Sequence, residues 1–248
     1  MARILVPLPL TDFDPTEVAV PWAAFGEAGH SVTFATETGG IARADERTLG
    51  RGDGPLPQRS LVAHADNQSL YDRLAGADAF REPVRWADAA LADFDAILFP
   101  GGHGPGMRPY CESPDVQRLA VEAFAGEKLV GAICHGVLPL ARARTHDDRP
   151  LLEGRHTTSL TALMERLSIA MTRRRLGDHY RTYPETVEAE TRRAVGRSGT
   201  YLRGPMLPHY ATRERPDLGF VVEDGAYLSA RWPGDAWTLA RRMLERLA

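Results

Sequence analysis

The chain has 248 residues, of which 43% are hydrophobic, and this is enough for one α/β domain with a substantial core over residues 1–248. The 30 basic and 33 acidic residues leave a net charge of −3, which gives no electrostatic support for binding nucleic acid or an anionic membrane. No apolar run reaches the roughly 18 residues of a transmembrane helix, and Cys111 and Cys134 do not form a disulfide framework. We therefore expect a cytoplasmic protein without nucleic-acid or membrane partners.

The N-terminal part predicts a strand, a helix and a second strand. Residues 3–8 (RILVPL) form a short apolar run that is typical of a strand covered on both faces. Asp14 is a good N-cap and Pro15 fits the first helical position, so a helix is expected from there to Gly29. Residues 31–36 (SVTFAT) predict the next strand. This order of elements indicates a parallel sheet with helices on both faces.

The middle of the chain repeats this alternation after an interruption. Residues 43–93 are polar and contain many glycines and prolines, and we expect them to form a small cap-like insertion with short helices. Residues 95–100 (DAILFP) and 128–133 (KLVGAI) predict two more buried strands. Helices are expected over residues 113–127 and 136–144. The alternation predicts a flavodoxin-like α/β sandwich with a mostly parallel central sheet.

The C-terminal part mixes clear and unclear segments. Residues 151–159 predict a strand and residues 160–177 a helix. Residues 178–216 are charged and are expected to be irregular; their Tyr- and His-containing stretch forms either a roof over a pocket or plain surface. Residues 220–232 predict a β-hairpin because they contain an aspartate–glycine turn. Residues 235–248 predict an amphipathic helix that closes the fold.

The most specific local feature is the sequence KLVGAICHGVLPLA, in which Cys134, His135 and Gly136 stand between a predicted strand and a predicted helix. Ligands of parallel sheets bind outside the carboxyl ends of the strands. A sharp turn at this point exposes the cysteine side chain, and the N-terminus of the following helix favours a thiolate. The pattern therefore favours a cysteine nucleophile with a lowered pKa. The alternative is a buried structural cysteine.

A glycine-rich loop, FPGGHGPG, follows the strand predicted over residues 95–100. Glycines let the backbone approach a ligand closely and direct its N–H groups at it. The loop lacks the helix and the GK[ST] sequence of phosphate-binding motifs. We interpret Gly101, Gly102 and His103 as an oxyanion-binding turn beside the cysteine. A glycine turn without any ligand is the alternative.

The sequence DFDAILFPGGHGPG, followed by VGAICHG, resembles the ThiJ/PfpI superfamily, whose members have a class I glutamine amidotransferase-like fold. The resemblance is closest to the branch that contains heat-shock chaperones and glutathione-independent glyoxalases (glyoxalase III). It covers the chain from Arg3 to about Glu165 and returns in the terminal hairpin and helix. The two motifs are specific for the fold and the nucleophile but not for the substrate, because the superfamily hosts several activities.

The resemblance also implies roles for individual residues. In that branch the cysteine is the nucleophile, the adjacent histidine is its base, and a glutamate on the first helix hydrogen-bonds the cysteine region. These roles correspond to Cys134, His135 and Glu17 here. For Glu17, the residues alone favour a capping box at the third helical position. The acid that orients the histidine corresponds to Glu165, with a solvated helix residue as the alternative, and His156 is a competing partner for the cysteine.

The activity implied by the resemblance is a cofactor-independent lyase of the glyoxalase III type, which converts methylglyoxal to lactate. No metal is expected, because the position that supplies a histidine in metal-binding relatives corresponds to about Phe25. A homodimer is implied, as in most relatives. The alternatives are a pathway-specific cysteine hydrolase, hydratase or lyase, which the arginine-rich residues 171–203 favour, and a stress chaperone or oxidation sensor with little catalysis.

Overall fold

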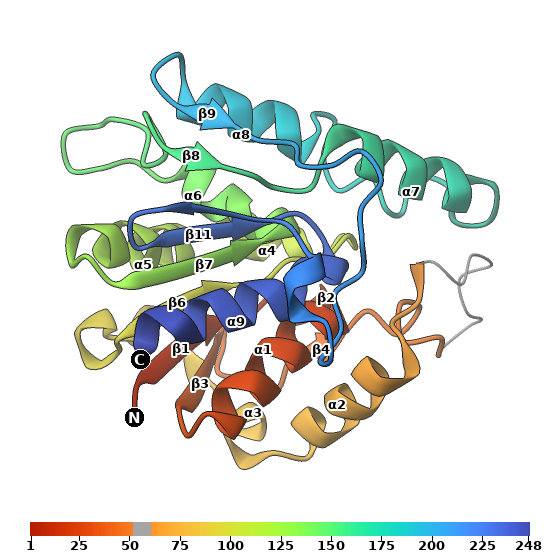
Figure 1. Ribbon diagram of the computed structural model, residues 1–248, viewed down its shortest axis with the longest axis horizontal. Helices are drawn as coiled ribbons and strands as arrows, with labels where there is room; N and C mark the ends of the chain where they lie inside the picture. The colour runs from red at the N-terminus through yellow and green to blue at the C-terminus, as the bar shows by residue number, and fades with distance from the viewer. Residues whose placement is uncertain (52–60) are drawn as a thin grey trace.

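The computed structural model describes residues 1–51 and 61–248. Its centre is a seven-stranded sheet (Figure 1), made of β1 (Arg3–Pro7), β3 (Ser31–Thr36), β5 (Val84–Arg85), β6 (Ala96–Phe99), β7 (Leu129–Ile133), β10 (Val221–Asp224) and β11 (Tyr227–Ala230). The strand order is β10-β11-β7-β6-β1-β3-β5. All neighbouring pairs are parallel except the hairpin β10–β11. The predicted α/β fold with a mostly parallel sheet is confirmed.

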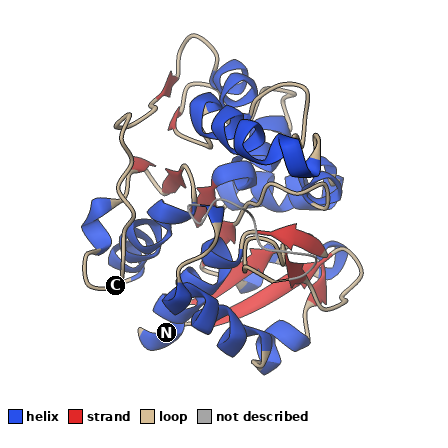
Figure 2. Cartoon of the chain, turned by 90° about the vertical axis from the view of Figure 1, so that its right-hand side faces the viewer, coloured by secondary structure: helices blue, strands red, loops and turns tan. Residues whose placement is uncertain are grey.

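Helices cover both faces of this sheet, as Figures 1 and 2 show. One face carries two helices that also contact each other, α1 (Pro15–Glu27) and α9 (Ala236–Leu247). The other face carries α4 (Met107–Glu112), α5 (Pro114–Ala125) and α6 (Leu138–Arg142). Across residues 1–51 and 61–248, no helix combines the length and apolar character needed to cross a bilayer.

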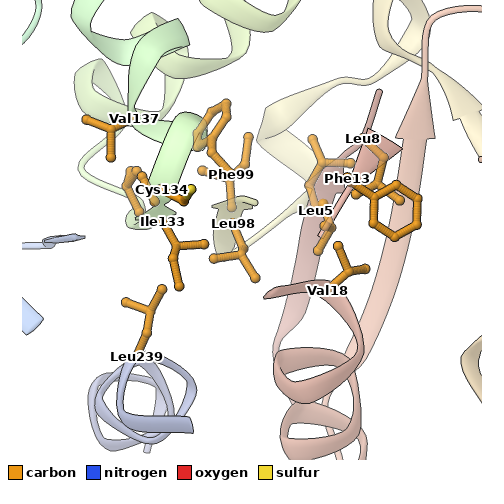
Figure 3. Close-up of a cluster of buried hydrophobic side chains, with 14 of the residues drawn as sticks. Leu5, Leu8, Phe13, Val18, Leu98, Phe99, Ile133, Cys134, Val137 and Leu239 are labelled. Atoms are coloured by element: carbon orange, nitrogen blue, oxygen red, sulfur yellow. The ribbon is translucent and has the colours of Figure 1, made fainter. Parts of the chain in front are cut away.

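The core lies between the sheet and these helices. Every residue of β6 and β7 is buried, as expected for central strands that are covered on both faces. Figure 3 shows Leu98, Ile133 and Leu239 meeting between the sheet and α9, with Cys134 in the same apolar cluster. The nucleophile predicted from the sequence therefore sits at the boundary between the core and the carboxyl end of β7.

The segment 43–93, expected as a cap-like insertion, does not form one unit: its parts pack against different elements of the fold. Its start, β4 (Arg43–Ala44), pairs with β2 (Thr11–Phe13), and α2 (Ala65–Ala75) packs against α1, with α3 (Asp78–Arg81) next to β3. Its end belongs to the sheet layer instead of a cap, because β5 is the edge strand and the Trp86 indole donates a hydrogen bond of 3.0 Å to the Ala35 carbonyl. Residues 52–60 lie outside the described residues.

The last third of the chain builds a further layer beside β10. The strand predicted over residues 151–159 is reduced to β8 (His156–Thr157), which pairs with β9 (Thr200–Tyr201). The helix predicted over residues 160–177 is present as α7 (Ala162–Leu176).

Residues 178–216, expected to be irregular, contain the helix α8 (Val187–Val195). The Thr186 hydroxyl caps it by accepting the Ala189 amide at 3.3 Å. The sequence prediction missed this helix because charged residues alternate with small ones and leave only a narrow apolar stripe.

Candidate active site

Cys134 follows β7 directly and begins the 3₁₀ turn η4 (Cys134–Val137), which leads into α6. Its φ of 59° lies in the left-handed region, which is uncommon for residues other than glycine. Two residues later, a side chain at Gly136 would overlap the Phe99 carbonyl oxygen, so only glycine fits this close approach to β6. Such a strained strand-to-helix turn is the geometry of a nucleophile elbow.

Three side chains from three different elements surround the Cys134 sulfur. The His135 Nδ1 atom lies 3.6 Å from it. Atoms of His103, Cys134 and His135 that could ligate a metal all lie within 4.8 Å of one another, and the two imidazole rings meet edge-on with centroids 4.9 Å apart. Glu17 approaches from α1, and its buried carboxyl acts on the Cys134 sulfur, although its Oε1 atom makes no hydrogen bond of normal geometry among the described residues. The structure thus brings together the cysteine, histidine and glutamate that the sequence analysis selected.

The carboxyl of Glu17 is fully buried between the glycine loop and the cysteine. Its Oε2 accepts the Gly101 amide at 2.8 Å, while the Asp14 amide donates to the Gly101 carbonyl at 2.8 Å. A capping box would need the Glu17 carboxylate to accept the Asp14 amide, so the structure does not contain one. Burial, and then the Asp14 charge, raise the pKa of Glu17 well above its ordinary value. Both effects favour the protonated form of Glu17, which can donate a proton toward the sulfur.

The pKa of Cys134 moves in the direction opposite to the sequence prediction. Burial raises it well above the ordinary value, the Glu17 charge raises it further, and the hydrogen bond from the His135 amide offsets only part of this. The expected lowering by a helix N-terminus is wrong because η4 is a single 3₁₀ turn and α6 has only five residues. Because the Glu17 charge raises the pKa of the Cys134 thiol, ionisation of both groups in the free protein is disfavoured.

The two histidines of the site are neutral near pH 7. Burial, and then the charges of His103 and Arg142, lower the pKa of His135 well below its ordinary value. Burial alone lowers the pKa of His103 to about 4. The His135 Nε2 atom is buried without a hydrogen-bond partner in the described part of the chain. A neutral His135 ring facing the thiol can accept its proton when a substrate makes ionisation favourable.

Glu165, predicted to orient His135, instead hydrogen-bonds the N-terminus of α8. Its Oε2 accepts the amide of Val187, the first residue of α8, at 2.9 Å. In the same way Glu188 in α8 accepts the amide of Ala162, the first residue of α7, at 2.9 Å. The two glutamates cross-link the helix N-termini, where negative charge is favourable. Among the described residues, no carboxylate hydrogen-bonds the His135 ring.

His156, the competing partner for the cysteine, lies on the exposed side of β8. Its backbone amide donates to Asp224 at 2.7 Å, which fixes β8 against the hairpin. No interaction with Cys134 joins it to the site within residues 1–51 and 61–248.

The glycine loop lies against the elbow. A Cβ atom at Gly101 would come within 2.7 Å of the His135 nitrogen and 2.9 Å of the Cys134 Cβ, so this position needs glycine. The Gly101 amide is already used by Glu17, whereas the Gly102 amide has no acceptor among residues that the structure describes. The His103 carbonyl accepts the Thr182 hydroxyl at 2.8 Å. Of the predicted oxyanion turn, the amides of Gly102 and His103 have no acceptor among the described residues, whereas the Gly101 amide is used by Glu17.

The His103 side chain, which the sequence analysis assigned to the turn only through its backbone, faces a pocket. Its Nε2 lies 3.3 Å from the Ser168 hydroxyl, and its ring contacts Tyr180 edge-on. Tyr180 therefore lines the pocket instead of lying on plain surface. The other lining residues are mainly acidic, aromatic or aliphatic and include Asp12, Asp14, Asp45, Leu61, Val62, Leu160, Met164, Tyr210 and Trp232.

The arrangement around the sulfur also has the donor set of a soft metal site. A thiolate and two imidazoles are ligands that Zn²⁺ accepts, and His103, Cys134 and His135 offer them. The sequence prediction of no metal rested on the position of Phe25, which is buried in α1. His103 was assigned to the oxyanion turn instead, and its ring was not expected to lie beside Cys134, because the two residues are separated in sequence.

We predict that iodoacetamide alkylates Cys134 before Cys111. The Cys111 thiol is buried, its pKa is raised to about 12 by that burial, and it points at the His135 carbonyl at 3.7 Å. Cys134 lies beside the pocket that His103 lines. Because the pKa of Cys134 is raised, its labelling rate should increase as pH rises through and above neutrality. Peptide mass spectrometry of wild type and Cys111→Ser measures this, and earlier label on Cys111 would remove the nucleophile assignment.

Comparison with known proteins places this geometry in a family. The chain matches the family model described as "ThiJ/PfpI family-like" over residues 8–205. It is 26% identical over 255 residues to an uncharacterised protein of Schizosaccharomyces pombe, covering 99% of this chain and 84% of that protein. It is 24% identical over 153 residues to the glutathione-independent glyoxalase hsp3101 of the same yeast, which covers 60% of this chain and 59% of the glyoxalase.

A solved structure agrees with this placement at the level of the fold. The crystal structure of glyoxalase III from Candida albicans resembles the chain with a TM-score of 0.69 and 18% identity, over 98% of this chain and 96% of that one. The family match spans the first helix, the glycine loop and the cysteine elbow. The chain therefore belongs to the ThiJ/PfpI-like family and has distant relatives among the glutathione-independent glyoxalases.

Proposed function

We propose that the protein is a cysteine-dependent enzyme that converts a small reactive carbonyl compound, with methylglyoxal to lactate as its reference reaction, without glutathione. The observation that carries this proposal is the strained Cys134 elbow, whose sulfur lies beside the His135 ring and the buried carboxyl of Glu17, a group whose pKa is raised. Two distant yeast relatives are glutathione-independent glyoxalases, which supports the same chemistry.

The residues can supply each step of an internal redox rearrangement. His135 accepts the thiol proton as the Cys134 sulfur adds to the aldehyde carbon, and the new alkoxide takes a proton from Glu17 to form a hemithioacetal. The Gly102 amide would stabilise that oxygen while it is charged. The Glu17 carboxylate then removes the hydrogen of the former aldehyde carbon as a proton and returns it to the neighbouring carbon, while protonated His135 gives its proton to the ketone oxygen and takes up the hydroxyl proton of the hemithioacetal. This oxidises the first carbon to a thioester and reduces the second to an alcohol.

Water completes the reaction by attacking the thioester carbonyl. The carbon–sulfur bond breaks, lactate leaves, and the thiol recovers its proton. The sum is methylglyoxal plus water giving lactic acid, so no external oxidant or reductant is consumed. The same nucleophile, acid and oxyanion donor would also serve a pathway-specific cysteine hydrolase or lyase. The pocket favours that second candidate in one respect, because methylglyoxal has no group that needs its acidic walls.

We predict that purified protein forms lactate from methylglyoxal in the absence of glutathione and nicotinamide cofactors. A panel of small aldehydes and esters, assayed with wild type and Cys134→Ser in parallel, ranks the substrate classes. The glyoxalase proposal expects lactate from wild type and none above background from the variant. Hydrolysis of an ester without any lactate from methylglyoxal would instead support the hydrolase candidate.

A further inference from the structure

Three carboxylates line one side of the pocket. They belong to Asp12 in β2, Asp14 at the N-cap of α1, and Asp45 directly after β4, and the pairing of β2 with β4 brings them together. Each accepts at least one backbone amide, and Asp45 also accepts the Tyr180 hydroxyl at 2.6 Å. None of the three forms a salt bridge with a residue that the structure describes. Hydrogen bonds therefore fix the carboxylates without neutralising their charge.

Aromatic rings and an unpartnered hydroxyl face the same space. The pocket is lined by Tyr180, Tyr210 and Trp232, and the last two rings meet edge-on with centroids 5.5 Å apart. Thr16 also lines it, and the buried Thr16 oxygen makes no hydrogen bond of normal geometry although Asp14 and Tyr210 are close. Aromatic faces attract organic cations, and a free hydroxyl oxygen can accept an N–H donor.

No positive charge balances these groups inside the pocket. The lining contains no arginine or lysine within the described ranges. Arg47 acts on Asp45 electrostatically but is not part of the lining. Burial raises the pKa of Asp45 and, for Asp14, raises it to about 7. A cation that binds beside buried carboxylates without an ion-pair partner stabilises their charged form.

We propose that this pocket binds an organic ammonium group, and that the natural substrate of Cys134 is a small carbonyl compound that carries one. The inference rests on the proposed function and extends it by naming the substrate class. An ammonium group fits better than a metal ion, because the three aspartates are not among the groups of described residues whose ligand atoms converge. An ammonium group also uses the rings and the Thr16 hydroxyl, which a metal bound to carboxylates does not need.

His103 connects the pocket to the nucleophile. Its side chain lines the pocket, and its ring lies next to His135 with centroids 4.9 Å apart. His103 and His135 also share the cluster around the Cys134 sulfur, and Asp14, which lines the pocket, acts electrostatically on Cys134. A ligand whose carbonyl reaches the sulfur would therefore have its cationic end on the side of the pocket that the carboxylates line.

The test uses the full-length Cys134→Ala protein, which binds without reacting, and isothermal titration with two probes. Choline carries a quaternary ammonium, and 3,3-dimethylbutan-1-ol has the same shape with carbon in place of the charged nitrogen. Choline is expected to bind at least about tenfold tighter than the neutral alcohol. Adding Asp45→Asn should lower the choline affinity about tenfold and leave the neutral probe unchanged. The matched control is Asp93→Asn, an exposed aspartate distant in sequence from the pocket, which should change neither affinity.

Equal affinity for the two probes, or no measurable choline binding, would overturn the inference. A preference for choline that persists in both Asp45→Asn and Asp12→Asn would place the cation outside this pocket and would also overturn the inference. Two variants are used so that the test remains possible if one of them does not fold. The proposed function is judged separately, by lactate formation and by Cys134 labelling of the wild type. A choline preference in a protein with an inert Cys134 would refute the enzyme and keep the cation site, and the reverse result would refute only the cation site.

Discussion

Glu17→Gln is expected to lower kcat for the carbonyl substrate by about 10²- to 10⁴-fold, the contribution of a general acid–base residue. Glutamine keeps the size of the side chain and can still accept the Gly101 amide through its oxygen. It can also donate a hydrogen bond toward Cys134, but it cannot transfer a proton. Steady-state kinetics of wild type and variant measure the loss.

The melting temperature provides the readout that separates catalysis from structure. The pKa of Glu17 is raised in the folded protein, so its contribution to stability is fully present below the ordinary carboxyl pKa and is lost as pH rises through the folded value. Glutamine removes this dependence, and at pH 7 the variant should be at least as stable as wild type. The control is Glu27→Gln at the exposed end of the same helix, which loses only the ion pair to Arg213. A lower melting temperature with near-normal turnover would assign Glu17 a structural role.

Gly136→Ala is expected to lower the free energy of unfolding by about 3 kcal/mol, the upper part of the range for inserting a methyl group into a packed site. The new Cβ would overlap the Phe99 carbonyl oxygen and come within 2.7 Å of the Pro100 carbonyl oxygen. Both are backbone atoms of the chain that leads into the glycine loop, so relief requires moving the loop relative to Cys134. For a chain of this size the melting temperature should fall by about 6 to 12 °C.

The matched control is Gly26→Ala in α1, where the added methyl group meets nothing within 4 Å. Alanine is the better helix former, so this variant should gain up to about 1 kcal/mol. Thermal unfolding of the three proteins decides the comparison. If Gly136→Ala is as stable as wild type, the tight contact between the elbow and the end of β6 is not real.

The sequence predicted the fold well where burial is complete. The runs that became β6 and β7 are apolar at nearly every position because both of their faces are covered, and such runs stand out without any alignment. The helix α8 was missed for the opposite reason. Its buried positions include Glu188 and Thr191, whose polar atoms also bond residues distant in sequence, which a local pattern does not reveal.

The candidate site was predictable in its motifs but not in its long-range partners. Cys134 and His135 are adjacent in sequence, whereas the bond between Glu17 and Gly101 joins residues 84 positions apart. That bond excludes the capping-box alternative, and it depends on how α1 meets β6. In the same way, Asp12 and Asp45 are ordinary acids in separate segments until β2 pairs with β4. The pKa of Cys134 was predicted in the wrong direction because local helix geometry was considered and burial was not.

The most direct test of the central claim, that Cys134 is the covalent nucleophile, is mass spectrometry of the protein quenched in acid during turnover of methylglyoxal. Acid preserves the thioester that the proposed reaction forms. The account predicts a peptide containing Cys134 that carries the mass of the lactoyl group, absent from Cys134→Ser and unaffected in Cys111→Ser. Lactate production without any modified Cys134 peptide, or at an undiminished rate in Cys134→Ser, would contradict it.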